Sequence, residues 1–324
     1  MRQISRYAYP NTRIRAALSE LLDEDFFSRA SGMDFYAFLD ALEKTAYAGF
    51  IKNRETITPE QFESSCTEYD RKNIRKISSF FLSKNEKQII SLLDRRYSIE
   101  KLKVALRLWN KKQPYYQPAG EFSEILKAKT IDDVTELLKN SGYDHAIERA
   151  KEKFEKTGSL YPVEISIDRQ YFEQLHKAID KLSAADSPIA TSIIGAEIDR
   201  ENLLWLARIR LYYQGKVPVE LSGFIPGGAH LSENDLKKLM NQDMPSGDLR
   251  ISFHYTEIIE HLPEKISEID TILEGVIIRQ IRKALVQTPF SIGIPLGYIF
   301  LKLRETKRIV SIFMSKYLET KIYQ

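Results

Sequence analysis

Three segments of this 324-residue chain carry variants of one short pattern, spaced roughly a hundred residues apart. Each places an aliphatic residue four positions after a short polar or acidic residue, inside a long amphipathic run. Repetition at a fixed spacing indicates that one supersecondary unit was used more than once. The pattern therefore predicts three similar helical units around a pseudo-threefold axis, with a central cavity that can hold a partner. The three segments are 97–102, 198–203 and 304–309.

Two stretches rich in proline and glycine predict where the units meet. Residues 113–120 and 215–228 both interrupt helical patterns, because proline lacks an amide donor and glycine tolerates turns. We therefore expect one compact body made of the helical units 1–117, 118–222 and 223–324.

Helical periodicity runs through all three units and predicts an all-α fold. Asp34 suits the position that caps one helix, and Thr58 followed by Pro59 suits the start of another. Residues 160–167 alternate weakly between apolar and polar, so we expect a short extended link there. The expected helices cover 12–22, 34–47, 59–83, 86–109, 130–140, 143–156, 168–182, 187–213, 232–240, 255–285 and 295–317.

The charge balance argues against a nucleic-acid-binding protein. Lys and Arg number 48 and Asp and Glu 45, which leaves a net charge of only +3. Nucleic-acid-binding proteins usually show a concentrated basic surface. The basic clusters at 71–76 and 302–308 are interpreted as ordinary helix surface. With 43% hydrophobic residues, the chain can bury a substantial core.

Cys66 is the only cysteine, so an intrachain disulfide and a thiolate metal cluster are both excluded. This cysteine usage agrees with a reducing compartment. The N-terminus lacks the apolar stretch of a secretory signal. The most apolar window, 288–301, is shorter than the roughly twenty residues that span a bilayer. We expect a cytoplasmic protein without a membrane span, attached to the membrane only through a partner.

No arrangement of residues predicts an active site, a cofactor or a metal site. The glycines of 223–228 lack the lysine and hydroxyl residue of a phosphate-binding loop, so we interpret them as a bend. None of the five histidines pairs at a spacing of four, and His254 and His261 are interpreted as ordinary surface or core residues. The acidic surroundings of Cys66 would raise the pKa of its thiol, which argues against a nucleophile.

Polar residues in the second and third copies of the pattern interrupt segments that otherwise look buried. Such charged groups must be paired or line a wet cavity, because a stranded buried charge costs on the order of several kcal/mol. Asp199 and Asn202, three apart, can assist each other on one helix face. Two interpretations stay open: a self-satisfied network that holds the units together, or the lining of a central cavity. The polar residues are Glu197, Asp199, Asn202, Arg208 and Arg210, with Glu305 and Arg308 in the third copy.

Three motifs together resemble one known family. Residues 7–16 are similar to an opening Tyr-x-Tyr-x-Asn-x-Arg-hydrophobic-Arg, residues 197–203 to a helix with Asp-x-x-Asn-Leu, and residues 295–308 to a C-terminal helix. These motifs are those of the C subunit of the archaeal and bacterial A/V-type rotary ATPases, a relative of the d subunit of eukaryotic V-ATPases. The likeness spans nearly the whole chain. Only the first copy departs from it, with Ser98 and Lys101 in place of the aspartate and asparagine.

The resemblance implies an all-helical, funnel-like body without catalytic residues. Such a subunit would lie on the cytoplasmic face of the membrane rotor ring and receive the lower end of the central stalk. It would transmit torque during ATP-driven ion transport or ATP synthesis. The residues expected to contact the stalk are Tyr7, Arg13, Glu197, Asp199, Asn202, Arg208, Glu305 and Arg308.

Two other classes of function are weighed against this one. A helical-repeat scaffold that binds peptide or nucleic acid would need a continuous basic or aromatic stripe along one surface. A helical enzyme would need a convergent acid–base set, which we do not find in the sequence.

Overall fold

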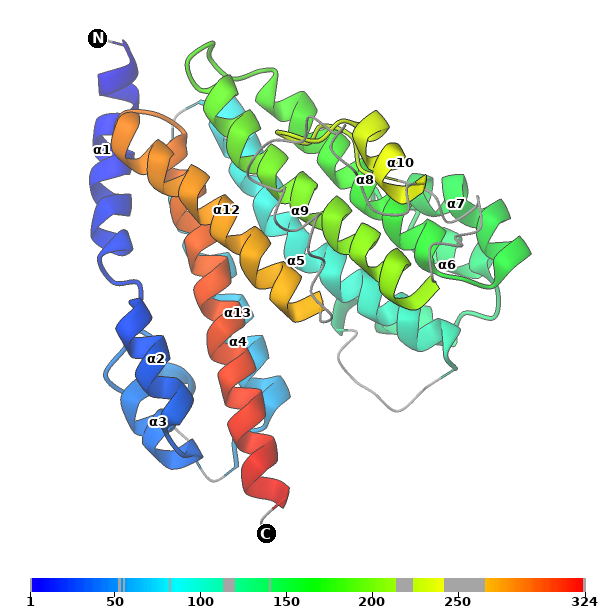
Figure 1. Ribbon diagram of the computed structural model, residues 1–324, viewed down its shortest axis with the longest axis horizontal. Helices are drawn as coiled ribbons and strands as arrows, with labels where there is room; N and C mark the ends of the chain where they lie inside the picture. The colour runs from blue at the N-terminus through cyan, green and yellow to red at the C-terminus, as the bar shows by residue number, and fades with distance from the viewer. Residues whose placement is uncertain are drawn as a thin grey trace. The chain divides into compact units, whose positions relative to one another are not determined.

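Helices make up all the regular structure in the described part of the chain. The computed structural model (Figure 1) describes residues 2–51, 54, 56–81, 83–112, 120–139, 141–213, 224–241 and 266–322. Within these ranges every regular element is a helix, which confirms the predicted all-α fold. No helix in the described ranges is both long and apolar enough to cross a bilayer. His254 and His261 lie outside these ranges. The backbone of Arg210 is described, but its side chain is not.

The chain divides into two compact units. Unit 1 combines Met1–Asp94 with Leu285–Gln324, and unit 2 is the intervening Arg95–Ala284. Helices α5 (Lys84–Asn110) and α12 (Ile266–Gln287) each run from one unit into the other. The division into three helical units and the funnel with its central cavity stay predictions.

In its described residues, unit 1 contains five α-helices and a short 3₁₀ turn, in addition to the first part of α5 and the end of α12. The predicted starts at Asp34 and Thr58 are confirmed: the Asp34 carboxylate accepts from Ala37 N, and Thr58 forms a capping box with Gln61. Pro59 takes the first helical turn, where its missing N–H costs nothing. The helices are α1 (Arg2–Leu18), α2 (Glu24–Gly32), α3 (Phe35–Leu42), η1 (Ala48–Phe50), α4 (Pro59–Ser79) and α13 (Gly293–Ile322).

The last helix organises the core of unit 1. In Figure 1, α13 lies beside α1 and α4, and it also packs against α3. Its fully buried Phe313 stacks on Phe62 of α4, with ring centroids 4.1 Å apart, and meets the edge of Phe35 of α3 at 5.3 Å. One aromatic side chain of α13 therefore joins this helix to two helices near the start of the sequence.

Unit 2 contains the longer helices α8 and α9 with shorter ones beside them. Trp205 of α9 stacks on Tyr161 of α8 at 3.6 Å. Leu203, Leu236 and Leu273 belong to one buried apolar cluster that joins α9, α10 and α12. The helices are η2 (Gly120–Lys127), α6 (Ile131–Leu137), α7 (Asp144–Thr157), α8 (Tyr161–Ile179), α9 (Ser187–Tyr213) and α10 (Glu233–Asn241).

The extended link predicted at 160–167 is wrong. From Tyr161 these residues form the first turns of α8, which begins shortly after α7 ends at Thr157. Gly158 has a left-handed backbone (φ 67°) that stops α7, and Pro162 has the φ that a first helical turn requires. The apolar alternation misled the prediction because Val163 and Ile167 also share one buried helix face.

Several helix boundaries also differ from the prediction, among them those of α1 and α13. Helix α1 begins at Arg2 instead of residue 12 and contains Pro10, which a sequence pattern suggests as a helix break. Helix α13 continues to Ile322, five residues beyond the predicted end. The first residues of the predicted helix 255–285 lie outside the described residues.

We expect Phe313→Ala to lower the free energy of unfolding by about 3–5 kcal/mol, because it opens a cavity where three helices meet. Urea denaturation followed by circular dichroism measures this change. Leu318→Ala on the same helix, where the side chain is 58% exposed, is the matched control and should change little. Equal effects of both substitutions would contradict the role given to Phe313.

Candidate functional site

Asp199 and Asn202 of α9 hold the connecting segment 224–231 by its backbone. The Asn202 amide donates to the Ile225 carbonyl (2.8 Å), and its oxygen accepts from Ile225 N (2.9 Å). The Asp199 carboxylate accepts from His230 N (2.9 Å) and Leu231 N (3.3 Å). Both side chains are almost completely buried. At these two positions the structure therefore favours the self-satisfied network over a wet cavity lining.

The glycine pair in this segment is required by how closely it approaches α8 and α9. A Cβ on Gly228 would lie 1.9 Å from Asp199 Oδ1, and one on Gly227 would lie 2.0 Å from His176 Nε2. Gly227 also has a φ of 92°, which side chains rarely adopt. The two glycines thus form a bend and let the backbone reach the Asp199 carboxylate.

In unit 1, Glu305 of α13 likewise binds the backbone of a neighbouring segment. Its carboxylate accepts from Leu22 N (2.5 Å), just before α2, and from the Tyr47 hydroxyl (2.8 Å). Lys302, one turn earlier, donates to Glu305 (2.6 Å) and lies over the rings of Tyr47 and Tyr69. Burial and the nearby Glu305 charge raise the pKa of the Tyr47 hydroxyl, so it stays protonated and donates.

The second and third copies of the pattern therefore serve one purpose. In each, an acidic side chain on a long buried helix accepts backbone N–H groups from the segment that precedes a short helix, α10 for Asp199 and α2 for Glu305. Each carboxylate caps donors that would otherwise be buried without a partner. This common geometry agrees with the repetition seen in the sequence.

In unit 2, two residues that the sequence patterns do not indicate hold the segments around α6. The Trp109 indole of α5 donates to the Ala128 carbonyl (2.8 Å) before α6. Arg95 of α5 donates to the Ser141 carbonyl (3.0 Å) after α6 and to Gln174 of α8 (3.1 Å). Their side chains follow no repeated spacing, so no pattern in the sequence could have identified them.

Glu197 belongs to a buried ion network inside unit 2. Its carboxylate lies 3.6 Å from Arg96 of α5 and 3.7 Å from Arg200. Arg200 also pairs with Asp270 of α12 at 2.5 Å, and Glu201 pairs with Arg96 at 3.2 Å and Arg200 at 3.0 Å. Burial opposes the charge on Arg96, but Glu197 and Glu201 outweigh it and raise the guanidinium pKa. The network ties three helices together with paired charges.

The other expected contact residues have different surroundings. Tyr7 is fully buried, and its hydroxyl donates to Glu86 (3.4 Å). Arg308 pairs with Glu24 at 2.8 Å and covers the Phe27 ring. Arg13 and Arg208 are exposed on α1 and α9. Two of the eight expected residues are thus exposed, and a common cavity lined by all eight stays a prediction.

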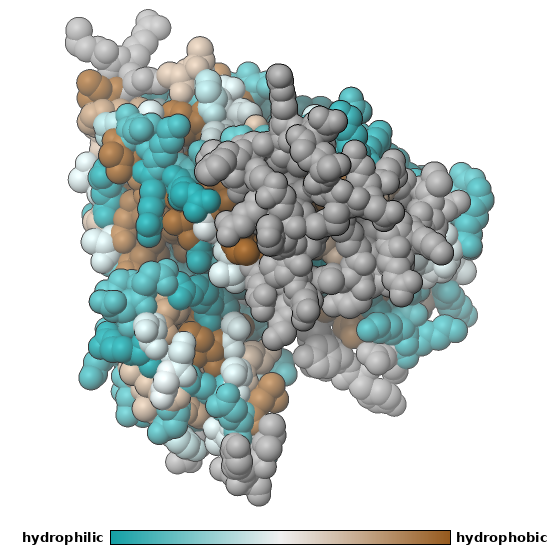
Figure 2. All heavy atoms as spheres, in the orientation of Figure 1, coloured by the Kyte–Doolittle hydropathy of each residue, from teal (hydrophilic) through white to brown (hydrophobic). Residues whose placement is uncertain are grey.

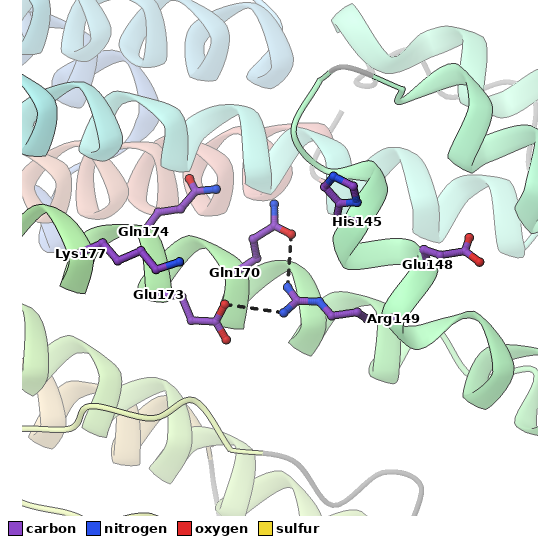
Figure 3. A pocket seen from close by; sticks show the side chains of 7 residues that line it. All are labelled: His145, Glu148, Arg149, Gln170, Glu173, Gln174 and Lys177. Atoms are coloured by element: carbon purple, nitrogen blue, oxygen red, sulfur yellow. Dashed lines mark hydrogen bonds and ion pairs between the residues drawn. The ribbon is translucent and has the colours of Figure 1, made fainter.

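A shallow groove of about 420 Å³ lies between α7 and α8 (Figure 3). In it Arg149 reaches across to Gln170 (3.2 Å) and Glu173 (3.6 Å). An open groove of mixed charge suits a polar protein surface better than an enclosed small molecule. Its lining residues are His145, Glu148, Arg149, Gln170, Glu173, Gln174 and Lys177.

Groups that could support catalysis or metal binding are sparse in the described residues. Across the described ranges, no three or more His, Cys, Asp or Glu side chains come together as a metal site would require. Cys66 lies buried in the core of unit 1. Burial, followed by the nearby Asp70, raises the pKa of its thiol, so the cysteine is a packing residue.

Comparison with known proteins gives consistent results over nearly the whole chain. The sequence model of the family described as "ATP synthase (C/AC39) subunit" matches residues 10–321. The C subunit of the A-type ATP synthase of Methanothermobacter thermautotrophicus is 26% identical, with 96% of this chain and 84% of the relative covered. The same protein of Pyrococcus abyssi is 22% identical, covering 94% and 85%. That of Halobacterium salinarum is 32% identical over 133 residues, covering 38% and 37%.

We expect Asn202→Ala to lower the free energy of unfolding by about 2–4 kcal/mol, because it leaves the buried Ile225 N–H and C=O without partners. Chemical denaturation measures the change. Arg208→Ala, an exposed change on the same helix, should stay within about 0.5 kcal/mol of wild type. An Asn202 variant as stable as this control would show that the contact to Ile225 is dispensable.

A second prediction concerns pH. Burial alone would raise the pKa of the Glu201 carboxyl, but Arg96 and Arg200 outweigh burial and hold it below its ordinary 4.5. A depressed pKa gives stability that is present above the unfolded-state value and is lost as the pH falls through the folded-state value. We expect Glu201→Gln to be about 1–2 kcal/mol less stable than wild type at neutral pH, a gap that closes in acid.

Denaturation of wild type and Glu201→Gln across a series of pH values measures this gap. Glu148→Gln, an exposed change in the same unit, is the control. If the gap between wild type and Glu201→Gln stays constant from neutral to acid pH, the ion network does not act through the Glu201 charge.

Proposed function

Since the chain belongs to the ATP synthase (C/AC39) subunit family, we propose that it is a non-catalytic coupling subunit of an A/V-type rotary ATPase. In this role it acts as a socket that joins the central stalk to the membrane rotor ring. It transmits torque during ATP-driven ion transport or ATP synthesis. The relatives named as C subunits of A-type ATP synthases, which match over most of their length, support this assignment.

The observation that carries the proposal is that polar side chains of the long helices bond to neighbouring segments and helices. A part that transmits torque must resist twisting, and apolar layers alone are not directional. Here directed bonds supplement them: the Asp199 and Asn202 contacts to backbone, the Glu305 contact to Leu22, and the ion network around Arg200. Hydrogen bonds and paired charges fix register because they depend on orientation. Such hydrogen bonds and ion pairs within each unit suit a rigid coupling subunit.

We also propose a smaller set of residues for the contact with the stalk. Asp199, Asn202 and Glu305 already bond within their own units and are buried. We propose that they support the socket and that the exposed Arg13 and Arg208 are available to contact partner subunits. A charge that remains hydrated at a surface allows reversible contact with a partner.

The family of this chain is named for a subunit of ATP synthase, and we propose that the complex is membrane-associated. We propose that the chain lies on the cytoplasmic side of that complex and reaches the membrane through the rotor ring. No ligand or cofactor takes part in this role, and we expect the isolated chain to hydrolyse no ATP.

Reconstitution tests the proposal. The purified chain should bind both central-stalk subunits and the detergent-solubilised rotor ring of its own complex in pull-down measurements. Arg13→Glu with Arg208→Glu should weaken stalk binding about tenfold or more, since each reverses an exposed charge, while thermal stability changes little. Asn202→Ala, the matched comparison, should lower stability.

Two results would contradict the proposal. The first is failure of the wild-type chain to bind either stalk or ring. The second is ATP hydrolysis by the isolated chain. Loss of stalk binding with Asn202→Ala at a temperature where that variant is folded would instead place Asn202 in the contact surface.

A further inference from the structure

One end of unit 1 is free of acidic residues over three segments that meet in space. The segments 2–19, 71–85 and 285–304 contain no Asp or Glu. Helix α1 joins them: Tyr7 meets the edge of Phe81 at 5.9 Å, and Asn11 donates to the Pro289 carbonyl at 2.7 Å. The charge of this end is therefore set by lysine and arginine, although the whole chain is nearly neutral.

Two carboxylates close to this end are already paired. Glu86 is buried and pairs with Arg6 at 3.0 Å. Asp94 pairs with Arg71 at 3.1 Å and Arg75 at 3.6 Å. These pairs leave a set of exposed cations beyond them on α4 and α5. The set consists of Lys72, Lys76, Lys84 and Lys87.

Large apolar side chains are exposed on the same segments. Ile4 is 54% exposed, Tyr9 62%, Val286 79% and Phe290 41%. They are four of the eight large hydrophobic side chains exposed in the described part of the chain. Tyr9 also meets the edge of Phe80 at 5.8 Å, which places an aromatic pair at the end of α4, the helix that carries Lys72 and Lys76. Figure 2 shows apolar and polar surface interleaved along the N-terminal helix.

We propose that this end of unit 1, here named the basic apolar end, binds the anionic headgroup surface of a membrane leaflet. It consists of the four exposed lysines together with the exposed side chains of Ile4, Tyr9, Val286 and Phe290. Lysine and arginine near a leaflet are attracted to anionic lipid, and neighbouring aliphatic and aromatic side chains enter the boundary between headgroups and acyl chains. The chain itself would thus touch lipid, a contact additional to the stalk and ring contacts proposed above.

A lipid surface fits these residues better than another polyanion. An acidic peptide or a nucleic-acid backbone would neutralise the lysines but leave Ile4 and Val286 in water. A leaflet supplies phosphate for the cations and hydrocarbon for the apolar side chains. The basic cluster at 71–76 thereby acquires a role other than ordinary helix surface.

Vesicle sedimentation with the full-length chain tests the proposal. We expect binding to vesicles of phosphatidylcholine mixed with phosphatidylglycerol, weakening as salt is added, and little binding to phosphatidylcholine alone. Each lysine near an anionic leaflet contributes about fivefold in affinity. Changing Lys72, Lys76, Lys84 and Lys87 together to Gln should therefore lower affinity about a hundredfold or more.

A matched variant separates the local effect from net charge. Changing the exposed Lys111, Lys129, Lys153 and Lys177 of unit 2 to Gln removes the same charge and should leave most of the vesicle binding intact. Ile4→Ser with Val286→Ser should weaken vesicle binding severalfold but leave binding to soluble polyglutamate unchanged. Circular dichroism verifies that each variant is folded.

Three results would overturn the proposal. Equal binding to both kinds of vesicle would exclude headgroup charge as the cause. Equal loss from the two lysine sets would assign binding to net charge. Tighter binding to polyglutamate or RNA than to anionic vesicles would make another macromolecule the partner. None of these outcomes bears on stalk or ring binding, so the coupling role stands or falls separately.

Discussion

The structure depends on recognition of backbone amides by side chains of the long helices. A buried N–H without a partner costs as much as several good apolar contacts gain, so the segments between helices can pack inside only where something accepts from them. Asp199 and Asn202 do this for 224–231, and Glu305 does it before α2. The same need explains the glycines at 227 and 228, which allow the close approach.

Rigidity follows from this arrangement. Apolar packing around Phe313 in unit 1 and Leu203 in unit 2 supplies most of the attraction that holds each unit together. The directed contacts add orientation: Arg200 links α9 to α12 through Asp270, and Lys302 links Glu305 to two aromatic rings. Each unit is held in both ways, which suits the coupling role proposed above.

Local features of the fold could be predicted from the sequence, and long-range ones could not. The capping residues Asp34 and Thr58 fix where helices start through contacts to residues three positions later. Such starts can therefore be predicted from the local sequence. The target of Asp199 is a backbone amide about thirty residues on, and no side-chain type marks it. The partner of Glu197 on α5 lies about a hundred residues earlier. For residues 160–167, the apolar positions are compatible both with the two-residue alternation of a strand and with one face of a helix, so the sequence did not distinguish the two.

The path of the chain affects how the protein can be made. Unit 1 begins with the first helices but is completed only by α13, whose Phe313 fills the space between α3 and α4. On a ribosome, unit 2 can emerge whole while the apolar faces of α3 and α4 still await their covering helix. Chains that fold with such a delay expose aggregation-prone surface, and chaperones protect it. We therefore expect chaperones to bind the nascent chain until α13 has left the exit tunnel.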